Sequence, residues 1–209
     1  MKIPLHYQRT EYDCGPTSLL NAISFLFDVE DFPPDILRYL MIYTLDRHNE
    51  NGEAHKNGTS KMAMSFIAYW LNDYAKATKF PIHAETLSGR DVYIYEDSPI
   101  IKALRQGGTA VVRVFLDCGH YVTLTGLSEE GIELFDPYYL NTSFPHADIR
   151  MIDNKPFSAN RLVAFEHFNR EDRIPYAFGP INDRTAVILY NMNTRKTTEK
   201  TTESQPVPS

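Results

Sequence analysis

The chain has 209 residues, of which 43% are apolar and 12% aromatic, enough material for the core of one domain. Its formal charge of -6 shows no basic surplus, so nucleic acid is not an expected partner. No apolar run reaches the ~18–20 residues of a membrane-spanning helix, and the N-terminus lacks the apolar stretch of a secretory signal. We therefore expect a soluble, cytoplasmic globular protein.

Helices are expected in the first third of the chain. Over residues 15–28, apolar side chains recur at Leu19, Ile23 and Phe27, and Pro16 suits a first helical turn. The other elements expected here are a helix over about residues 35–43, a polar loop over 45–58, and a helix that starts at Thr59 or Ser60 and continues over 61–77.

The pattern then changes to the period of strands. Three apolar segments joined by tight turns, at 109–116, 120–127 and 131–137, predict an antiparallel meander. Further expected elements are strands at 82–87, 92–96, 161–168 and 185–191, and a helix within 97–108. From residue 194 onward the composition predicts disorder, which gives one domain over 1–193 and a tail over 194–209. Helices in front of an antiparallel sheet make an α+β fold.

Cys14 stands directly before Gly15 and Pro16, where the first helix is expected to begin. Unpaired N–H groups and aligned peptide dipoles at a helix N-terminus favour a negative charge, and the thiolate is the nucleophilic form of cysteine. Many free cysteines are simply small buried groups. Its place at the helix start makes Cys14 a candidate nucleophile.

A nucleophilic cysteine needs a base, and His120 is the candidate. It opens a predicted strand, where alternation places it with Val122 and Leu124 on the face expected to pack against the helices. The other histidines are interpreted as ordinary surface or core residues: His6, His48, His55, His83, His146 and His167. Metal-ligand spacing is absent, so we expect neither a metal nor a cofactor.

Asp136 and Gln8 complete the candidate site. Asp136 ends the next predicted strand. Because side chains alternate along a strand, its carboxylate is expected on the same face as His120, where it would orient the imidazole. Gln8 lies six residues before Cys14, and its side-chain amide can fold back to hold an oxyanion together with the Cys14 N–H. Alone, an Asp-Pro is a common turn former and a glutamine a common surface residue. Together, the four residues predict thiol-dependent acyl transfer.

Cys118, the second cysteine, lies two residues before His120. We interpret it as a small apolar residue near a turn. The alternative is a reversible disulfide with Cys14, which requires Cα atoms closer than ~7 Å. The two cysteines make neither a disulfide framework nor a CxxC zinc motif.

Gln8 followed by "DCGPTSLLNA", "GHYVTLTG" and "FDPY" resembles the papain-like cysteine peptidases, specifically the bacteriocin-processing, double-glycine peptidase-like branch. The resemblance covers about residues 5–140. It implies a papain-like fold in which a helical half packs against an antiparallel sheet. It also assigns the oxyanion glutamine to Gln8, the nucleophile to Cys14, the base to His120 and the orienting aspartate to Asp136.

The sequence therefore predicts a free-standing cysteine peptidase that cleaves a peptide or protein substrate through an acyl-enzyme on Cys14. Two alternatives stay open at this point. One is an amidase or acyltransferase that uses the same Cys-His-Asp site on a small molecule or modified peptide. The other is a catalytically silent module that binds a peptide.

Overall fold

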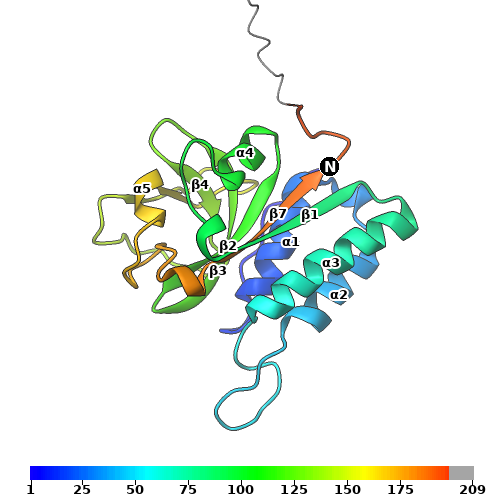
Figure 1. Cartoon of the computed structure of the whole chain (residues 1–209), viewed down its shortest axis with the longest axis horizontal. Helices are drawn as coiled ribbons and strands as arrows, with labels where there is room; N and C mark the ends of the chain where they lie inside the picture. The colour runs from blue at the N-terminus through cyan, green and yellow to red at the C-terminus, as the bar shows by residue number, and fades with distance from the viewer. Residues whose placement is uncertain (198–209) are drawn as a thin grey trace, which may run out of the picture.

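The computed structural model of the chain describes residues 1–197. Within that range, helices and one antiparallel sheet form an α+β fold, as the sequence predicts (Figure 1). The helices are α1 (Cys14–Leu26), α2 (Pro34–Thr44), α3 (Lys61–Thr78), α4 (Pro99–Arg105) and α5 (Phe165–Phe168). The strands are β1 (Ile82–Ser88), β2 (Thr109–Leu116), β3 (Cys118–Leu127), β4 (Ile132–Phe135), β5 (Ile149–Met151), β6 (Arg161–Val163) and β7 (Thr185–Asn191).

The strands of the described residues form a seven-stranded sheet in the order β1-β7-β2-β3-β4-β6-β5. Every neighbouring pair is antiparallel, and β2, β3 and β4 make the predicted meander. The last strand in sequence, β7, lies between β1 and β2. The sheet is therefore completed by the end of the described chain.

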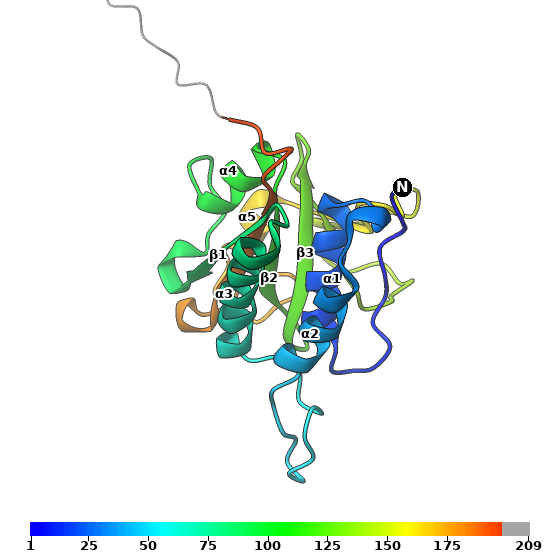
Figure 2. The same ribbon diagram turned by 90° about the vertical axis from the view of Figure 1, so that its right-hand side faces the viewer.

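The three long helices cover one face of the sheet (Figures 1 and 2). The apolar side of α1, which the spacing of its apolar residues predicts, packs against this face of the sheet, and Leu19 and Ile23 are fully buried. Ser18 fastens α1 to β3: its hydroxyl donates to the Tyr121 carbonyl at 2.9 Å, and its own carbonyl accepts from the Thr123 hydroxyl at 2.8 Å. These contacts place the start of α1 beside the start of β3.

The opposite face carries a second apolar core, beneath α4 and α5. Val122 and Leu124 point into this core, whereas Tyr121 faces α1. The expectation that Val122 and Leu124 face the front helices is therefore wrong. His120 is not part of this second core, and Cys14 of α1 acts on its ring. Side chains alternate between the two faces along the strand, as predicted. Because helices cover both faces of this sheet, both faces are apolar, and the pattern of apolar residues could not show which face packs against α1.

The expected strand over 92–96 is also wrong. Val92 and Ile94 are buried, as residues of a strand often are, but no neighbouring strand pairs with their backbone. The Val92 N–H donates to the Gly89 carbonyl at 3.2 Å, and side chains pair with the other backbone groups. The Asn169 side chain accepts from the Ile94 N–H and donates to its carbonyl, both at 2.8 Å. Arg184 donates to the Val92 carbonyl at 3.2 Å. Distant side chains satisfy this backbone, a solution that local pattern does not reveal.

The segment over 161–168, expected as one strand, divides in two. Its first three residues form β6, and the rest turns at Ala164 into the short helix α5. The short strand β5, which the sequence analysis did not predict, pairs with β6 at the sheet edge. Elsewhere the helix signals hold, because the Ser60 and Ser98 hydroxyls cap α3 and α4 as N-cap residues.

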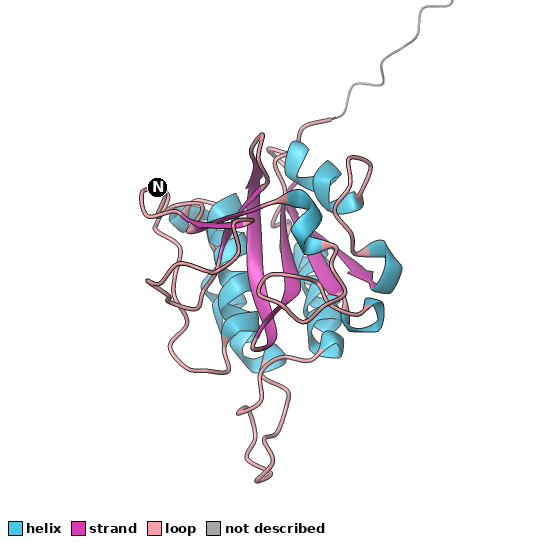
Figure 3. Cartoon of the chain, turned by 90° about the vertical axis from the view of Figure 1, so that its left-hand side faces the viewer, coloured by secondary structure: helices cyan, strands magenta, loops and turns pink. Residues whose placement is uncertain are grey.

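The polar segment between α2 and α3 extends away from the body of the molecule, as Figures 1, 2 and 3 show. Of the expected tail, Thr194 and Lys196 donate backbone hydrogen bonds to the carbonyls of Asn191 and Gln106. Residues 198–209 lie outside the described part of the chain. Over the described residues, no helix is both long and apolar enough to cross a membrane.

Candidate active site

Cys14 is the first residue of α1, and its side chain is buried at the sheet. The residue before it, Asp13, does not cap the helix with its side chain. Its carboxylate instead accepts hydrogen bonds from the N–H groups of Arg9 and Thr10, at 3.2 and 2.9 Å, and so shapes the turn that leads into α1. The first-turn N–H groups are thus left without a side-chain cap, and their dipoles favour negative charge beside Cys14.

His120 lies near the start of β3 and is buried, with 5% of its surface exposed. Its ring nitrogen Nε2 lies 2.7 Å from Asp136 Oδ1. Nδ1 is therefore the ring nitrogen that remains for Cys14, whose side chain acts on His120 by hydrogen bonding and by charge. The imidazole thus contacts the carboxylate directly and lies within the electrostatic influence of the thiol.

The protonation of His120 is decided by opposing effects. Burial disfavours the charged ring, but the charge and hydrogen bond of Asp136, followed by those of Cys14, raise the pKa of His120 to about 10. Burial likewise disfavours the Asp136 carboxylate, yet His120 and two further donors hold the pKa of Asp136 below its usual value. The favoured pair near neutral pH is imidazolium and carboxylate.

Asp136 follows β4 directly and is fully buried. Its Oδ1 also accepts from the Tyr138 N–H at 2.8 Å, and its Oδ2 accepts from the Tyr176 hydroxyl at 2.6 Å. The Asn160 side chain bonds both backbone groups of Asp136, accepting from its N–H at 2.7 Å and donating to its carbonyl at 2.8 Å. Both the backbone and the carboxylate of Asp136 are held in place.

Gln8 lies beside this group, because its N–H donates to the Pro137 carbonyl at 2.8 Å. Its side-chain nitrogen Nε2 donates one hydrogen to the Thr10 carbonyl, also at 2.8 Å. A primary amide nitrogen carries two hydrogens, so one N–H of Gln8 is left for another acceptor. Its Oε1 is buried and has no partner among the described residues.

Two more buried oxygens in the described chain lack a partner, the hydroxyls of Thr59 and Tyr121. A Cβ at Gly15 would lie 2.2 Å from Thr59 Oγ1, so Thr59 packs against the residue next to Cys14. Burial raises the pKa of Tyr121, and the charge of Cys14 raises it further.

The second cysteine sits in a different environment. Cys118 is exposed and lines a polar pocket of about 400 Å³ together with Arg113 and Arg173. Cys118 is therefore not the buried apolar residue that we expected. Both thiols are free in the structure, and the alternative of a reversible disulfide with Cys14 is untested. In residues 1–197 no group of three His, Cys, Asp or Glu side chains is arranged to hold a metal ion.

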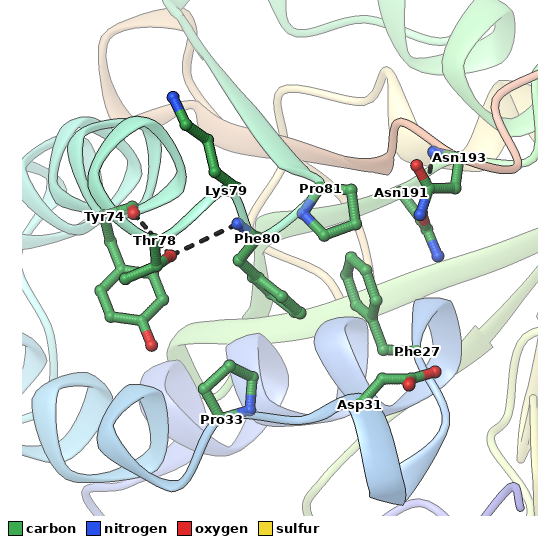
Figure 4. Close-up of a pocket in the computed structure, with 10 residues that line it drawn as sticks. All are labelled: Phe27, Asp31, Pro33, Tyr74, Thr78, Lys79, Phe80, Pro81, Asn191 and Asn193. Atoms are coloured by element: carbon green, nitrogen blue, oxygen red, sulfur yellow. Dashed lines mark hydrogen bonds between the residues drawn. The ribbon is translucent and has the colours of Figure 1, made fainter.

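A further pocket, of about 370 Å³, opens at the far end of α1 from Cys14 (Figure 4). Phe27, just after α1, and Phe80 form its apolar part, and their rings lie 4.5 Å apart. Lys79 and Asp31 are the charged residues that line it. Neither cysteine nor histidine is among its lining residues, so it is not a candidate for the chemistry described above.

Sequence reasoning did not assign roles to Asn160, Arg161 and Tyr176. All come from the last third of the chain, where the sequence resembles no motif of the peptidase family. The one signal was Arg161 at the head of an apolar strand pattern, "RLVAF", where a charged residue has no obvious solvent face. Asn160 and Tyr176 lie in irregular segments, and only the fold brings them to Asp136.

No family model matches the chain, and no curated protein matches it. Among solved structures, it is similar to a double glycine motif protease from an AMS/PCAT transporter, solved in complex with the leader peptide. The two are 14% identical, the match covers 90% of each chain, and the TM-score is 0.44. Since this score is below 0.5, we infer nothing from the likeness.

Proposed function

We propose that the chain is a thiol-dependent acyl-transfer enzyme, most simply a cysteine peptidase with a papain-like arrangement of helices and sheet. The observation that carries the proposal is the contact chain at His120, with Asp136 Oδ1 2.7 Å from Nε2 and Cys14 acting on the ring. A nucleophile, a base and an orienting carboxylate in this order are what thiol acyl transfer requires.

The first half of the reaction forms an acyl-enzyme. The Cys14 thiolate attacks the carbonyl carbon of the substrate, and the carbonyl π electrons move onto its oxygen. The Cys14 N–H and the second N–H of Gln8 Nε2 are the donors for that oxyanion. When the carbon–nitrogen bond breaks, the His120 imidazolium gives its proton to the leaving amine, which leaves a thioester on Cys14.

The second half restores the enzyme. Neutral His120 takes a proton from a water molecule as the water oxygen attacks the thioester carbon. The carbon–sulfur bond then breaks, the carboxylic acid leaves, and Cys14 returns as a thiolate beside the imidazolium. Throughout, Asp136 keeps Nε2 occupied, which directs Nδ1 toward the sulfur.

The test compares two cysteine variants. Cys14→Ala should abolish both turnover of a peptide pool, read by mass spectrometry, and alkylation by iodoacetamide under mildly acidic conditions. Cys118→Ser is the matched control, because it removes the exposed thiol and should keep turnover and labelling. Turnover that survives in Cys14→Ala would refute the proposal.

The acyl acceptor is tested on the same proteins. With peptide substrate alone, the peptidase yields a free carboxylic acid. Adding a primary amine and finding that the amide product dominates would assign the enzyme to acyl transfer instead of hydrolysis. Peptide binding that is equal in wild type and Cys14→Ser, without turnover in either, would assign it to the silent binding modules.

A further inference from the structure

The Asp136 carboxylate is held from the side away from His120 by a second buried chain of contacts. Its Oδ2 accepts from the Tyr176 hydroxyl at 2.6 Å, and that hydroxyl accepts from Arg161 Nε at 3.1 Å. All three side chains are buried, with at most 2% of their surface exposed. The hydrogen-bonded contacts therefore run from Arg161 through Tyr176 and Asp136 to His120, the ring on which Cys14 acts.

The backbone of Tyr176 indicates that its side chain is needed at this position. Its φ angle of 63° lies in the left-handed region, which glycine occupies easily and other residues seldom do. The backbone is fixed there because the Tyr176 N–H donates to the Phe115 carbonyl and the Phe115 N–H donates to the Ala177 carbonyl. His167 Nε2 bonds the Pro175 carbonyl at 2.7 Å just before it. A strained conformation held from both sides is typical of functional positions.

Arg161 carries a charge that the protein interior would otherwise disfavour. Among the described residues, its guanidinium donates to neutral oxygens only: the Tyr176 hydroxyl, the Asn160 carbonyl at 2.8 Å and the Leu140 carbonyl at 3.3 Å. Burying an uncompensated charge costs several kcal/mol. The negative charge that faces it is Asp136, with the Tyr176 hydroxyl between them.

We propose that Tyr176, held by Arg161, is a positioning residue that fixes the Asp136 carboxylate in the orientation in which it accepts from His120 Nε2. The proposal rests on the proposed function for its consequence in catalysis, but its geometry does not depend on the substrate. The charged and titratable groups around Asp136 are His120 on β3, Arg161 on β6 and Tyr176, and the Tyr138 N–H adds a neutral donor.

The electrostatics agree with this arrangement. Although burial opposes ionisation, the Tyr176 hydrogen bond is one of the contacts that hold the pKa of Asp136 low. Burial and the Asp136 charge raise the pKa of Tyr176, so its hydroxyl keeps the proton that it donates to the carboxylate, while the Arg161 charge acts in the opposite direction. Removing the hydroxyl should let the carboxylate rotate and bind a proton more readily.

The experiment is a ¹³C NMR titration of the Asp136 carboxyl group, assigned by its loss in Asp136→Asn. In Tyr176→Phe the titration midpoint should move to higher pH. With a substrate, kcat should fall about tenfold or more while KM changes little, because a hydrogen bond to a charged group is lost. Tyr190→Phe is the matched control, since Tyr190 is a buried tyrosine at the end of β7 that lies far from His120.

An unchanged Asp136 midpoint in a folded Tyr176→Phe protein would overturn the proposal, even if thermal stability fell. Two further proteins keep the test decisive should Tyr176→Phe fail to fold. Replacing Tyr176 by 3-fluorotyrosine makes the hydroxyl a stronger donor at nearly constant volume, so the midpoint should move to lower pH. Arg161→Lys keeps the charge but loses the Nε donor, so its midpoint should move up; no movement would remove Arg161 from the proposal.

The failure of the proposed function remains distinguishable from the failure of this inference. The NMR titration needs no substrate and no reaction. If wild type turns over nothing while Tyr176→Phe moves the midpoint, the positioning role stands and the peptidase proposal falls. If wild type is active and the midpoint stays fixed, the reverse holds.

Discussion

At His120, burial and the Asp136 carboxylate act on the same imidazole in opposite directions. Burial alone would favour the neutral ring, yet Asp136 and Cys14 outweigh it and bring the pKa to about 10. One carboxylate therefore decides whether the base of the proposed site carries a proton near neutral pH. Both predictions at this scale follow from that balance.

Asp136→Asn should lower the pKa of His120, since burial then acts with less opposition. The measurement is the rate of Cys14 alkylation by iodoacetamide as a function of pH, in a Cys118→Ser background. The change in rate that accompanies loss of the His120 proton should occur at a lower pH in Asp136→Asn than in the parent protein. Asp148→Asn is the matched control, because Asp148 bonds a different histidine, His167, at 3.1 Å. The expectation would be contradicted if this change in rate occurred at the same pH in Asp136→Asn as in the parent, or if it moved by the same amount in Asp148→Asn.

The same raised pKa links stability to pH. Because the folded-state pKa of His120 lies above the ordinary value of 6.5, its contribution is complete below pH 6.5 and is lost as the pH rises through about 10. The difference in unfolding free energy between wild type and His120→Gln should therefore shrink across this interval. Urea unfolding at several pH values measures it, and a difference that grows with pH would show that the sign is wrong.

At the scale of elements, the packing of α1 against the segment that leads into α3 depends on the lack of a side chain at Gly15. A Cβ there would meet Thr59 Oγ1 at 2.2 Å and Thr59 Cβ at 2.7 Å. Gly126 in β3 is the contrast, since the nearest atom to its Cβ position is Glu133 Oε2 at 3.7 Å. The residue after Cys14 thus sets how closely Thr59 approaches α1.

Gly15→Ala should lower the free energy of unfolding by about 1–3 kcal/mol, the usual cost of overpacking. Denaturant unfolding measures the loss, and Gly126→Ala should lose clearly less. Thr59→Gly removes the atoms that clash, so in a double-mutant cycle it should recover much of the loss from Gly15→Ala. Equal costs for the two alanine variants, or no recovery in the cycle, would show that Thr59 does not set this contact.

The sequence predicts elements well where local signals and burial agree. The helices α1, α2 and α3 and the meander β2–β4 carry such signals, including the serine cap at Ser60. It fails at Val92 and Ile94, where buried side chains look like a strand but distant Asn169 and Arg184 satisfy the backbone. No local pattern contains that information.

The candidate site divides in the same way. Cys14, His120 and Asp136 could be found because each stands at the end of an element with a readable pattern. Asn160, Arg161 and Tyr176 could not, because they lie in irregular backbone or on a three-residue strand. Asn160 and Tyr176 contact Asp136 across 24 and 40 residues of sequence, and Arg161 acts on Asp136 only through Tyr176.

At the scale of the whole molecule, β7 joins parts of the chain that are far apart in sequence. It pairs with β1 on one side and β2 on the other, and its residues contribute to both apolar cores. Val187 and Leu189 pack under the long helices, and Ala186 and Ile188 pack on the opposite face. Neither core is complete without this strand.

A chain that ends after Arg184 should therefore show no cooperative thermal transition, whereas a chain that ends after Thr197 keeps every described element and should melt like the full protein. Circular dichroism on heating distinguishes the two. A cooperative transition in the shorter chain would show that β1 and β2 hold the sheet without β7. Loss of the transition in the longer one would show that residues after 197 are required.

The late position of β7 has a consequence for the protein as it is made. A ribosome releases the helix that carries Cys14 long before it releases the strand that closes both cores. Until then the imidazole and the thiol have no complete scaffold to hold them together. If the chain is the proposed peptidase, a nascent chain should therefore be unable to cleave itself or its neighbours until β7 has been synthesised.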